Sequence, residues 1–222
     1  EEEFQNLCHE FGEAGYERRE HDAYWTEPRV TRALIRWLRG SSVLPPPARV
    51  WDPAVGRGDL LQEFFDTGYQ CFGTDLHNHP SVEPRVYEYE HAIDFFSIRS
   101  VPRPVEKAGC AIITNPPYDL AEQFIRHALW LAGKQCMVAM LFRSEFIHAK
   151  SRRDMFKPQA SFRAWLPLSF RPRWDWWERD KPKASPRHNF AWAVWDCRRA
   201  ADQAVIEILD DDGSDAPLFA PA

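Results

Sequence analysis

The sequence predicts an α/β fold in which helices cover a mostly parallel sheet, and three observations lead to that prediction. Short apolar runs alternate with segments of helical spacing along most of the chain. Two of these runs, 49–52 and 70–75, end at a carboxylate, and the run 110–114 is apolar throughout, as in a strand covered on both faces. Strands that alternate with helices form parallel sheets with right-handed crossovers. A length of 222 residues fits one such domain.

The first half of the chain supplies two helices and two strands. Residues 1–20 are polar without a sustained period, so we expect a flexible N-terminal segment ahead of a domain at 21–209. Apolar residues at helical spacing predict a helix over 28–38, with Pro28 in its first turn and Gly40 after its end. A strand at 49–52, a glycine loop, a helix at 59–65 and a strand at 70–75 follow.

The second half continues this alternation and then departs from it. We predict strands at 85–89, 110–114 and 136–142, a helix at 120–131 and a further helix that begins at Ser144. The runs 162–166 and 190–195 predict two strands without a helix between them, and therefore an antiparallel hairpin at the sheet edge. The acidic, Pro- and Ala-rich residues 210–222 predict a disordered tail.

The composition bears on cellular compartment, membrane association and metal binding. The five cysteines are scattered without a CxxC pair, which predicts reduced core cysteines and a cytoplasmic protein. No apolar stretch is long enough to cross a bilayer, and the N-terminus is acidic where a signal peptide is basic, so no membrane association is expected. His77-Asn78-His79 is a close histidine pair without a third ligand nearby, which favours a solvated loop over a metal site, so no metal is expected.

The charge is unevenly distributed along the chain. The net charge of -5 argues against a polyanion binder, yet fourteen Lys or Arg face six Asp or Glu between Arg143 and Arg199. A basic groove on an acidic body would explain this asymmetry, and chance clustering of surface charge is the alternative.

Polar residues follow three of the predicted strands, at the edge where doubly wound sheets bind ligands. The loop Asp52-Pro53-Ala54-Val55-Gly56-Arg57-Gly58 has two glycines that let the backbone turn sharply and approach a ligand, and it lacks the GxxxxGK[ST] and GxGxxG patterns of phosphate and dinucleotide loops. Asp75 is placed to accept hydrogen bonds from two ribose hydroxyls, unless it is a solvated acid at the strand end. Asp94-Phe95 could bind an adenine amino group and pack against its ring.

The fourth strand ends in the most informative stretch, Thr114-Asn115-Pro116-Pro117-Tyr118. The two prolines fix the backbone and remove two donors, which leaves carbonyls beside an Asn amide and a Tyr ring. Such a corner can accept hydrogen bonds from an amine while it stacks a planar group. At the end of a buried fourth strand, a plain turn is the weaker interpretation.

These residues resemble the amino-methyltransferases of the N6-adenine DNA methyltransferase type, in the small phage or bacterial form without a separate recognition domain. The family's (D/N/S)PP(Y/F) motif is similar to Asn115-Pro116-Pro117-Tyr118, its DPACGSG-like cofactor loop to residues 52–58, and its aromatic-Thr-Pro motif to Tyr24-Trp25-Thr26-Glu27-Pro28. The resemblance spans about residues 22–196 and departs from the family pattern at Val55, Arg57 and Glu27. Arg57 could crowd the cofactor pocket.

The resemblance implies a Rossmann-like class I methyltransferase fold and S-adenosyl-L-methionine as cofactor. It implies that Asn115 and Pro116 accept hydrogen bonds from the target amine, with Pro117 shaping the corner and Tyr118 stacking on a flipped base. The residues that it implies for cofactor binding are Tyr24, Thr26, Asp52, Pro53, Ala54, Gly56, Gly58, Asp75, Leu76, Asp94, Phe95 and Asn115.

A basic segment rich in tryptophan, 171–188, is the candidate nucleic-acid contact, because cations neutralise phosphates and indoles stack on bases. Its candidate residues are Arg171, Arg173, Trp174, Trp176, Trp177, Lys181, Lys183 and Arg187. The indoles could instead belong to the core. DNA is favoured over RNA as partner; an RNA adenine or guanine methyltransferase, a protein-glutamine methyltransferase and a non-catalytic binding module stay open. A homodimer or a partner subunit would supply the recognition surface that a chain of this length lacks.

Overall fold

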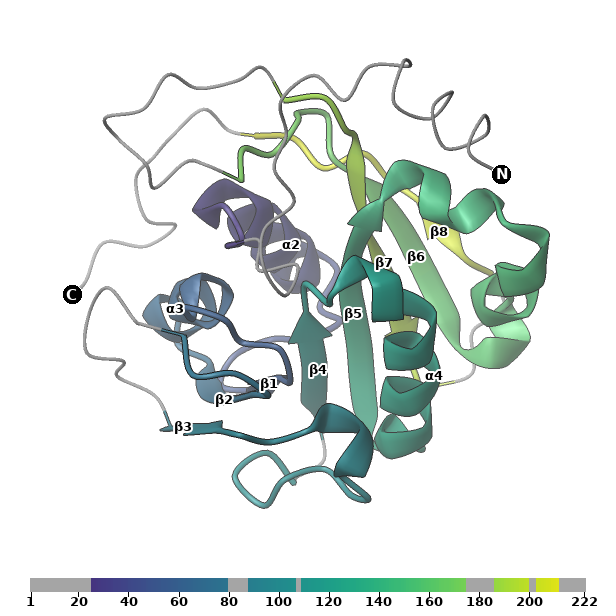
Figure 1. Ribbon diagram of the computed structural model, residues 1–222. Helices are drawn as coiled ribbons and strands as arrows, with labels where there is room; N and C mark the ends of the chain where they lie inside the picture. Colours follow the sequence, from purple (N-terminus) through teal and green to yellow (C-terminus); the bar gives the residue numbers. More distant parts are fainter. Residues whose placement is uncertain (1–24, 80–87, 107–108, 175–185, 200–202, 212–222) are drawn as a thin grey trace, which may run out of the picture.

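The strands form a single mixed sheet, which we describe from a computed structural model that places residues 25–79, 88–106, 109–174, 186–199 and 203–211. Within these residues the strand order is β3-β2-β1-β4-β5-β7-β6-β8 (Figure 1). The strand bounds are β1 Arg49–Asp52, β2 Gln70–Asp75, β3 Glu88–His91, β4 Cys110–Thr114, β5 Cys136–Arg143, β6 Phe162–Pro167, β7 Phe190–Asp196 and β8 Val205–Ile206.

Strands β1 to β5 run parallel, so their carboxyl ends share one edge of the sheet, which we call the carboxyl edge. Strand β7 is antiparallel to both β5 and β6. As a result β6 also ends at the carboxyl edge, and β7 begins there. Within the register, Arg143 lies opposite Phe190 and Pro167 lies opposite Ala191. The end of β6 and the start of β7 therefore flank the same edge as the ends of β1 to β5.

Helices cover both faces of the sheet (Figure 1). On one face α2 (Pro28–Gly40) and α3 (Asp59–Asp66) pack on a core that includes Leu34 and Phe64. On the other, α4 (Ala121–Ala132) packs on a second core that includes Trp51 and Trp195. Five short 3₁₀ segments complete the described chain: η2 Phe95–Ser97, η3 Tyr118–Leu120, η4 Ser144–His148, η5 Lys150–Phe156 and η6 Pro158–Ala160.

The predicted α/β architecture is confirmed, and most elements lie where the apolar pattern placed them. The runs 49–52, 70–75 and 110–114 are β1, β2 and β4 with the same bounds, and the helices differ from prediction by one or two residues at their ends. The fully apolar run of β4 has every residue buried, as a strand covered on both faces requires.

Three predicted elements need correction. No α-helix begins at Ser144; the described chain forms 3₁₀ turns there, which let Phe146 stack on Phe142 at 4.4 Å between ring centroids. The strand predicted at 85–89 is observed at 88–91, where mostly exposed side chains give no apolar signal, and 85–87 lie outside the described residues. The hairpin of β6 and β7 is antiparallel as predicted, but β8 pairs with β6 and takes the sheet edge.

The prediction of reduced core cysteines is wrong for one pair. Cys110 and Cys136 form a disulfide between β4 and β5. Their pairing follows from the parallel register, which sets these two residues directly opposite each other, a relation that their separation in sequence does not reveal. Cys71 and Cys197 are free, and burial raises the pKa of both thiols, that of Cys197 to about 11.

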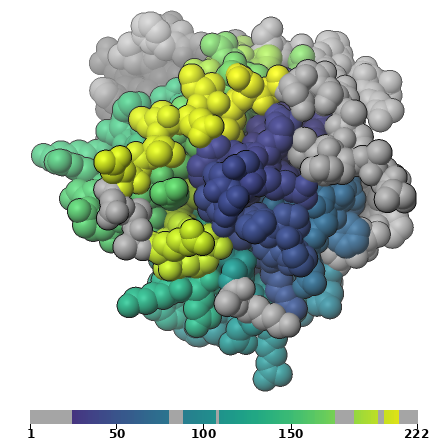
Figure 2. Space-filling view, turned by 180° about the vertical axis from the view of Figure 1, so that it is seen from behind, coloured from purple at the N-terminus to yellow at the C-terminus, as the bar shows by residue number. Residues whose placement is uncertain are grey.

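The segment after β8 packs beside α2. Seen from behind, the C-terminal residues in yellow border the purple surface of α2 (Figure 2). Trp37 donates from its indole nitrogen to the Glu207 carboxylate at 2.8 Å, and Arg36 donates to the Asp210 carbonyl at 2.7 Å. Asp210 and Asp211, the first residues of the predicted tail, thus have defined partners; 212–222 and the predicted flexible segment 1–20 lie outside the described residues. No helix in the described ranges is long and apolar enough to cross a bilayer.

Candidate active site

A cavity of about 650 Å³ opens at the carboxyl edge, beside the ends of β1, β2 and β4. Most residues predicted to bind the cofactor or the acceptor amine line it, although they are far apart in sequence. These are Thr26, Asp52, Pro53, Ala54, Gly56, Asp75, Leu76, Asp94, Phe95, Asn115 and Pro117. Its size lies within the range of about 300–1,000 Å³ that is usual for small-molecule sites.

The glycine loop between β1 and α3 forms one wall. The Val55 N–H donates to the Thr74 carbonyl at 3.1 Å, which ties the loop to β2. Gly56 (φ +54°) and Gly58 (φ +97°) adopt left-handed backbone conformations that side chains disfavour. Gly58 immediately precedes α3, so the loop turns the chain from the sheet edge into the helix.

Asp75 at the end of β2 is an ionised hydrogen-bond acceptor. Its Oδ2 accepts from the Gly56 N–H and its Oδ1 from the His77 N–H, both at 2.8 Å, and His79 Nε2 lies 3.5 Å from Oδ1. Burial alone would raise the pKa of this carboxyl, but the hydrogen bonds from His79, His77 and Gly56 outweigh burial and lower it. The side chain is therefore charged at neutral pH and lies in the cavity wall.

The pKa of Asp52, at the end of β1, is shifted in the opposite direction. Its side chain is almost completely buried, and burial raises the pKa to about 7 against the lowering effect of the Ala54 N–H, which donates to Oδ1 at 3.0 Å. The negative charge of Asp75 raises the pKa further. Two strand-end acids that look alike in sequence thus have pKa values shifted in opposite directions.

The opposite wall comes from the segment after β3. Phe95 is buried, and its ring contacts those of Trp51 at 5.7 Å and Phe124 at 4.7 Å. The Asp94 carboxylate accepts from the Phe96 N–H at 2.9 Å and so caps η2. This wall offers aromatic surface beside a carboxylate, which suits a planar ligand with amino groups.

The Asn-Pro-Pro-Tyr corner follows β4 directly. Asn115 donates from Nδ2 to the Thr26 hydroxyl at 3.3 Å and lines the cavity together with Pro117. Pro116 is buried behind them and does not line it. Tyr118 lies at the side of the cavity, with its ring 6.0 Å from Phe190 and the Arg143 guanidinium 5.8 Å from its ring centre.

Sequence reasoning missed several lining residues. Trp25 packs against the glycine loop so closely that a Cβ on Gly56 would meet the indole at 2.9 Å, and its ring contacts that of His79 at 5.1 Å. His77 and His79 line the cavity instead of forming the predicted solvated loop, because they follow Asp75 at the carboxyl edge. Two of the missed residues could have been inferred from their neighbours in sequence. Trp25 directly precedes the predicted residue Thr26, and Phe96, which also lines the cavity, directly follows the predicted residue Phe95. The other missed residues are Val55, Asp59, Leu60, Ile93, Asp119, Leu120 and Phe124.

Arg57, which could crowd the cofactor pocket, lines the cavity, and its side chain is only 10% exposed. Its guanidinium lies 3.1 Å from the Asp59 carboxylate and 5.8 Å from the Trp25 ring centre. The ion pair and the indole thus hold the arginine beside the glycine loop.

Cations gather near Tyr118. Arg143 ends β5, and burial together with the charges of Arg143 and Arg187 lowers the pKa of His188, against the opposing effect of Glu145. Arg171 donates to the Asn189 side chain at 3.0 Å. Of the predicted nucleic-acid contacts, Arg171, Arg173, Trp174 and Arg187 are described; Trp176, Trp177, Lys181 and Lys183 lie outside the described residues, as does Tyr24.

Comparison with solved structures places this sheet in a known class. The chain aligns over 85% of its length with a type I restriction-modification methyltransferase subunit from Streptococcus thermophilus, at a TM-score of 0.59 and 11% identity, covering 47% of that chain. A candidate class I S-adenosylmethionine-dependent methyltransferase from Listeria monocytogenes aligns over 94% of this chain and 72% of its own, at 0.56 and 10%. A candidate RNA methyltransferase from Pyrococcus horikoshii aligns over 87% and 96%, at 0.55 and 10%. The chain has the class I methyltransferase fold.

No protein-family model and no curated protein matches the chain. The class I methyltransferase fold binds its ligands at the carboxyl edge, as open α/β sheets do in general, and the cavity lies there. Within the described part of the chain, no group of three or more His, Cys, Asp or Glu side chains could hold a metal ion. Gly58, Pro116 and Tyr118 are the described residues of the predicted cofactor and acceptor sites that adjoin the cavity without lining it.

Proposed function

We propose that the protein transfers a methyl group from S-adenosylmethionine to an exocyclic amino nitrogen, with adenine N6 in DNA as the leading acceptor. One observation carries the proposal: the Asn115 corner and the Asp75 carboxylate line the same cavity. A nucleoside bound to Asp75 and an amine bound at Asn115 would therefore meet in a single space.

The residues present fit this cofactor. Asp75 is ionised and can accept hydrogen bonds from ribose hydroxyls, while Leu76 is 55% exposed at the cavity and offers apolar surface to a base. Asp94 and Phe95 provide a carboxylate and an aromatic ring in the same wall. The cofactor would supply the methyl group on a sulfonium centre, and this chain supplies the binding and the orientation of the acceptor.

In this proposal the corner residues act on the amine. The Asn115 amide oxygen and the Pro116 carbonyl accept its two hydrogen bonds, which turns the nitrogen lone pair towards the methyl donor without a strong base. Once the nitrogen carries the methyl group, it would release one of its protons to water. Tyr118 stacks on the base that carries the amine after the base has left its duplex. The base would take the place of the Arg143 guanidinium over the Tyr118 ring.

Nucleic acid is favoured by the charges around the corner. Arg143 lies beside Tyr118, and Arg187 and Arg171 lie by the residues that lead into β7 at the same edge, where they can neutralise phosphates next to a flipped base. One neighbour in fold is a restriction-modification methyltransferase subunit, which supports DNA as the substrate, and another is a candidate RNA methyltransferase. An RNA acceptor is the second candidate, because the Pyrococcus horikoshii neighbour covers most of both chains.

The direct test is incubation with labelled cofactor and separate duplex DNA, single-stranded DNA and structured RNA, followed by nucleoside mass spectrometry. We expect label in N6-methyladenine from DNA. Label in RNA nucleosides alone would select the second candidate. Absence of cofactor binding in calorimetry at about millimolar concentration, well above usual KM values, would leave a non-catalytic binding module.

Asn115→Ala is predicted to abolish methyl transfer while the affinity for S-adenosylmethionine stays within about threefold, because the amide serves the acceptor. Transfer is measured by label incorporation and affinity by calorimetry. Gln135→Ala removes an amide at the opposite edge of the sheet and is the matched control, expected to leave both unchanged. Unchanged turnover in Asn115→Ala would refute the assignment.

A further inference from the structure

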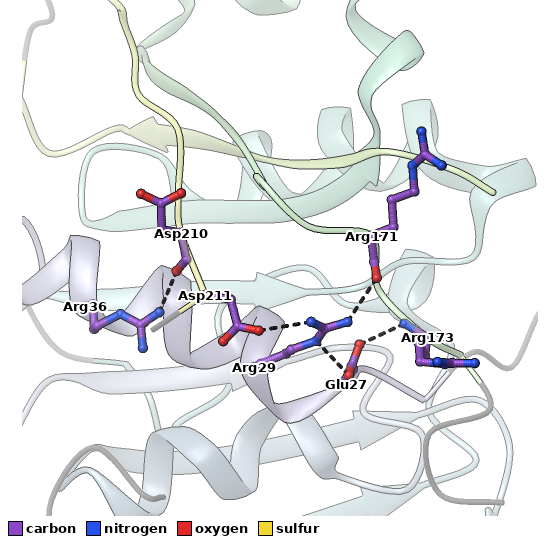
Figure 3. A network of polar contacts seen from close by, with 7 residues as sticks. All are labelled: Glu27, Arg29, Arg36, Arg171, Arg173, Asp210 and Asp211. Carbon is purple, nitrogen blue, oxygen red and sulfur yellow. Dashed lines mark hydrogen bonds and ion pairs between the residues drawn. The ribbon is translucent and has the colours of Figure 1, made fainter. Parts of the chain in front are cut away.

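Glu27 interrupts the aromatic-Thr-Pro pattern, and the structure gives its carboxylate two partners. Oε1 accepts from Arg29 Nε at 2.7 Å, and Oε2 accepts from the Arg173 backbone N–H at 2.8 Å (Figure 3). Glu27 occupies the N-cap position of α2, but its side chain makes no capping hydrogen bond. The side chain is 13% exposed, so the carboxylate is directed at the 170–173 segment and withdrawn from solvent.

The two residues before Glu27 contact the cavity. The Trp25 ring packs on Gly56, and the Thr26 hydroxyl accepts from the Asn115 side chain at 3.3 Å. Trp25, Thr26 and Glu27 therefore contact, respectively, the glycine loop, Asn115 and the 170–173 segment. A change at Glu27 leaves the first two contacts in place.

From the segment that Glu27 contacts, a series of aromatic rings leads to Tyr118, next to Asn115. Arg173 is followed by Trp174, whose ring contacts that of Phe190 at 4.9 Å. The Phe190 ring, which is buried, contacts that of Tyr118 at 6.0 Å. The hydrogen bond from Arg173 to Glu27 thus fixes the backbone from which this series begins.

Arg29 adds a second tie to the same segment. It donates to the Arg171 carbonyl at 3.0 Å, its guanidinium lies 4.5 Å from the Phe170 ring centre, and it pairs with Asp211 at 2.9 Å (Figure 3). Arg36 makes a separate contact to the Asp210 carbonyl, about two and a half helix turns along the chain from Glu27 (Figure 3). The network therefore has a part that reaches the 170–173 segment and a part that does not.

We propose that Glu27 is a positioning residue for the acceptor: by holding Arg173 it sets Trp174, Phe190 and hence the ring of Tyr118 on which the base stacks. The inference rests on the proposed function, since it assigns a role in recognition of the acceptor. Because Thr26 and Trp25 keep their own contacts, Glu27 governs acceptor binding and leaves cofactor binding untouched.

The test compares Glu27→Ala with Glu27→Gln. Both lose the same charge, so any electrostatic effect on polyanion binding is equal in the two, whereas the amide oxygen of glutamine can still accept from Arg173. We expect Glu27→Ala to raise the KM for the acceptor oligonucleotide about tenfold, the size of one charge-assisted hydrogen bond, with the cofactor Kd within about twofold. Glu27→Gln should stay within about threefold of the native KM.

Arg36→Ala is the matched control, because it removes a hydrogen bond of the same network that does not touch Glu27. It should lower thermal stability as much as Glu27→Ala and leave the KM unchanged. Glu27→Asp, which is too short to hold both partners, should give an intermediate KM and serves if Glu27→Ala fails to fold.

Equal KM values for Glu27→Ala and Glu27→Gln, or a raised KM in Arg36→Ala, would overturn the inference while methyl transfer by the native protein stands. A native protein without transfer to any nucleic acid would overturn the proposed function and this inference together.

Discussion

Asp52 and Asp75 show how two side chains with the same sequence signal acquire different chemistry. Each is the last residue of a parallel strand at the carboxyl edge. Asp75 receives N–H donors from Gly56 and His77 and stays ionised, whereas Asp52 receives the Ala54 N–H and lies deeper, which raises its pKa to about 7. The sequence could place both acids at the strand ends, but it could not tell which one the fold would bury.

The raised pKa of Asp52 has a direct consequence for stability. An unfolded Asp titrates near pH 4, so between about pH 4 and pH 7 the folded state holds a proton that the unfolded state has released. The contribution of Asp52 to stability is therefore complete below about pH 4 and is lost as the pH rises to about 7.

Asp52→Asn should gain about 2 kcal/mol of unfolding free energy relative to the native protein when the pH rises from about 5 to about 7.5. Urea denaturation at the two pH values measures this difference. Glu122→Gln is the comparison: hydrogen bonds and charges from Arg126 and Arg152 lower the pKa of Glu122, so its contribution is already complete above about pH 5 and its difference from the native protein should not change over this range. A constant difference for Asp52→Asn would contradict the burial argument.

Among the elements, β7 joins the two cores of the molecule. All seven of its residues are buried, and its side chains alternate between faces, with Trp192 in the core under α2 and Trp195 in the core under α4. Each indole also donates outward, Trp192 to the Val30 carbonyl at 3.1 Å and Trp195 to the Met155 carbonyl at 2.7 Å. One strand thus fastens α2 on one side and the 3₁₀ turns of η5 on the other.

Trp195→Phe should lower the unfolding free energy by about 2 kcal/mol, because the Met155 carbonyl loses its buried donor and a void remains. Trp130→Phe changes an indole that is 57% exposed on α4 and should stay within about 0.5 kcal/mol of the native protein. Both values come from urea denaturation curves. Equal losses in the two variants would mean that the indole hydrogen bond contributes nothing.

The elements also divide by how well the sequence predicted them. Strands β4 and β5 were predictable because their continuous apolar runs can be buried in few other ways, and β1 and β2 because their short apolar runs end at a carboxylate and alternate with helices. Strand β8 was missed, since Val205 and Ile206 are exposed and a pair of residues gives no periodic signal. The turns after Arg143 differ from the α-helix predicted there: they are 3₁₀ segments in which Phe146 stacks on Phe142 and contacts Phe156, and the apolar spacing does not distinguish this conformation from an α-helix.

Across the whole molecule, polar and charged side chains meet at one edge of the sheet. The parallel strands bring residues from five segments of the chain to the carboxyl edge, where Arg143 lies beside Tyr118, and Arg171 and Arg187 lie by the residues that lead into β7. The sequence predicted part of the cavity lining, namely the strand-end residues and the Asn115 corner, and the excess of positive charge between Arg143 and Arg199. It could not predict that Trp25 and His79 would close over the glycine loop, because that contact depends on how the chain enters α2.

If the carboxyl edge binds nucleic acid, affinity should fall steeply between about 0.05 and 0.2 M salt, because each phosphate that is neutralised releases counterions. Arg143→Ala should reduce the slope of log affinity against log salt by about one. Lys134→Ala removes a charge at the amino end of β5, on the opposite edge, and should leave the slope unchanged. Fluorescence anisotropy with a labelled oligonucleotide measures both. A flat response in the native protein would remove the argument for this interface.

The pairing of Pro167 with Ala191 has a consequence for how such a protein can diversify. The chain leaves the sheet after Pro167 and returns at Phe190 beside its own point of departure, where the Leu168 N–H donates to the Phe190 carbonyl at 2.9 Å. Residues can be exchanged, added or removed between these anchors at little cost to the strands, since the entropy of closing a loop grows slowly with its length. The connection is thus a place where the sequence can change while the sheet stays unaltered.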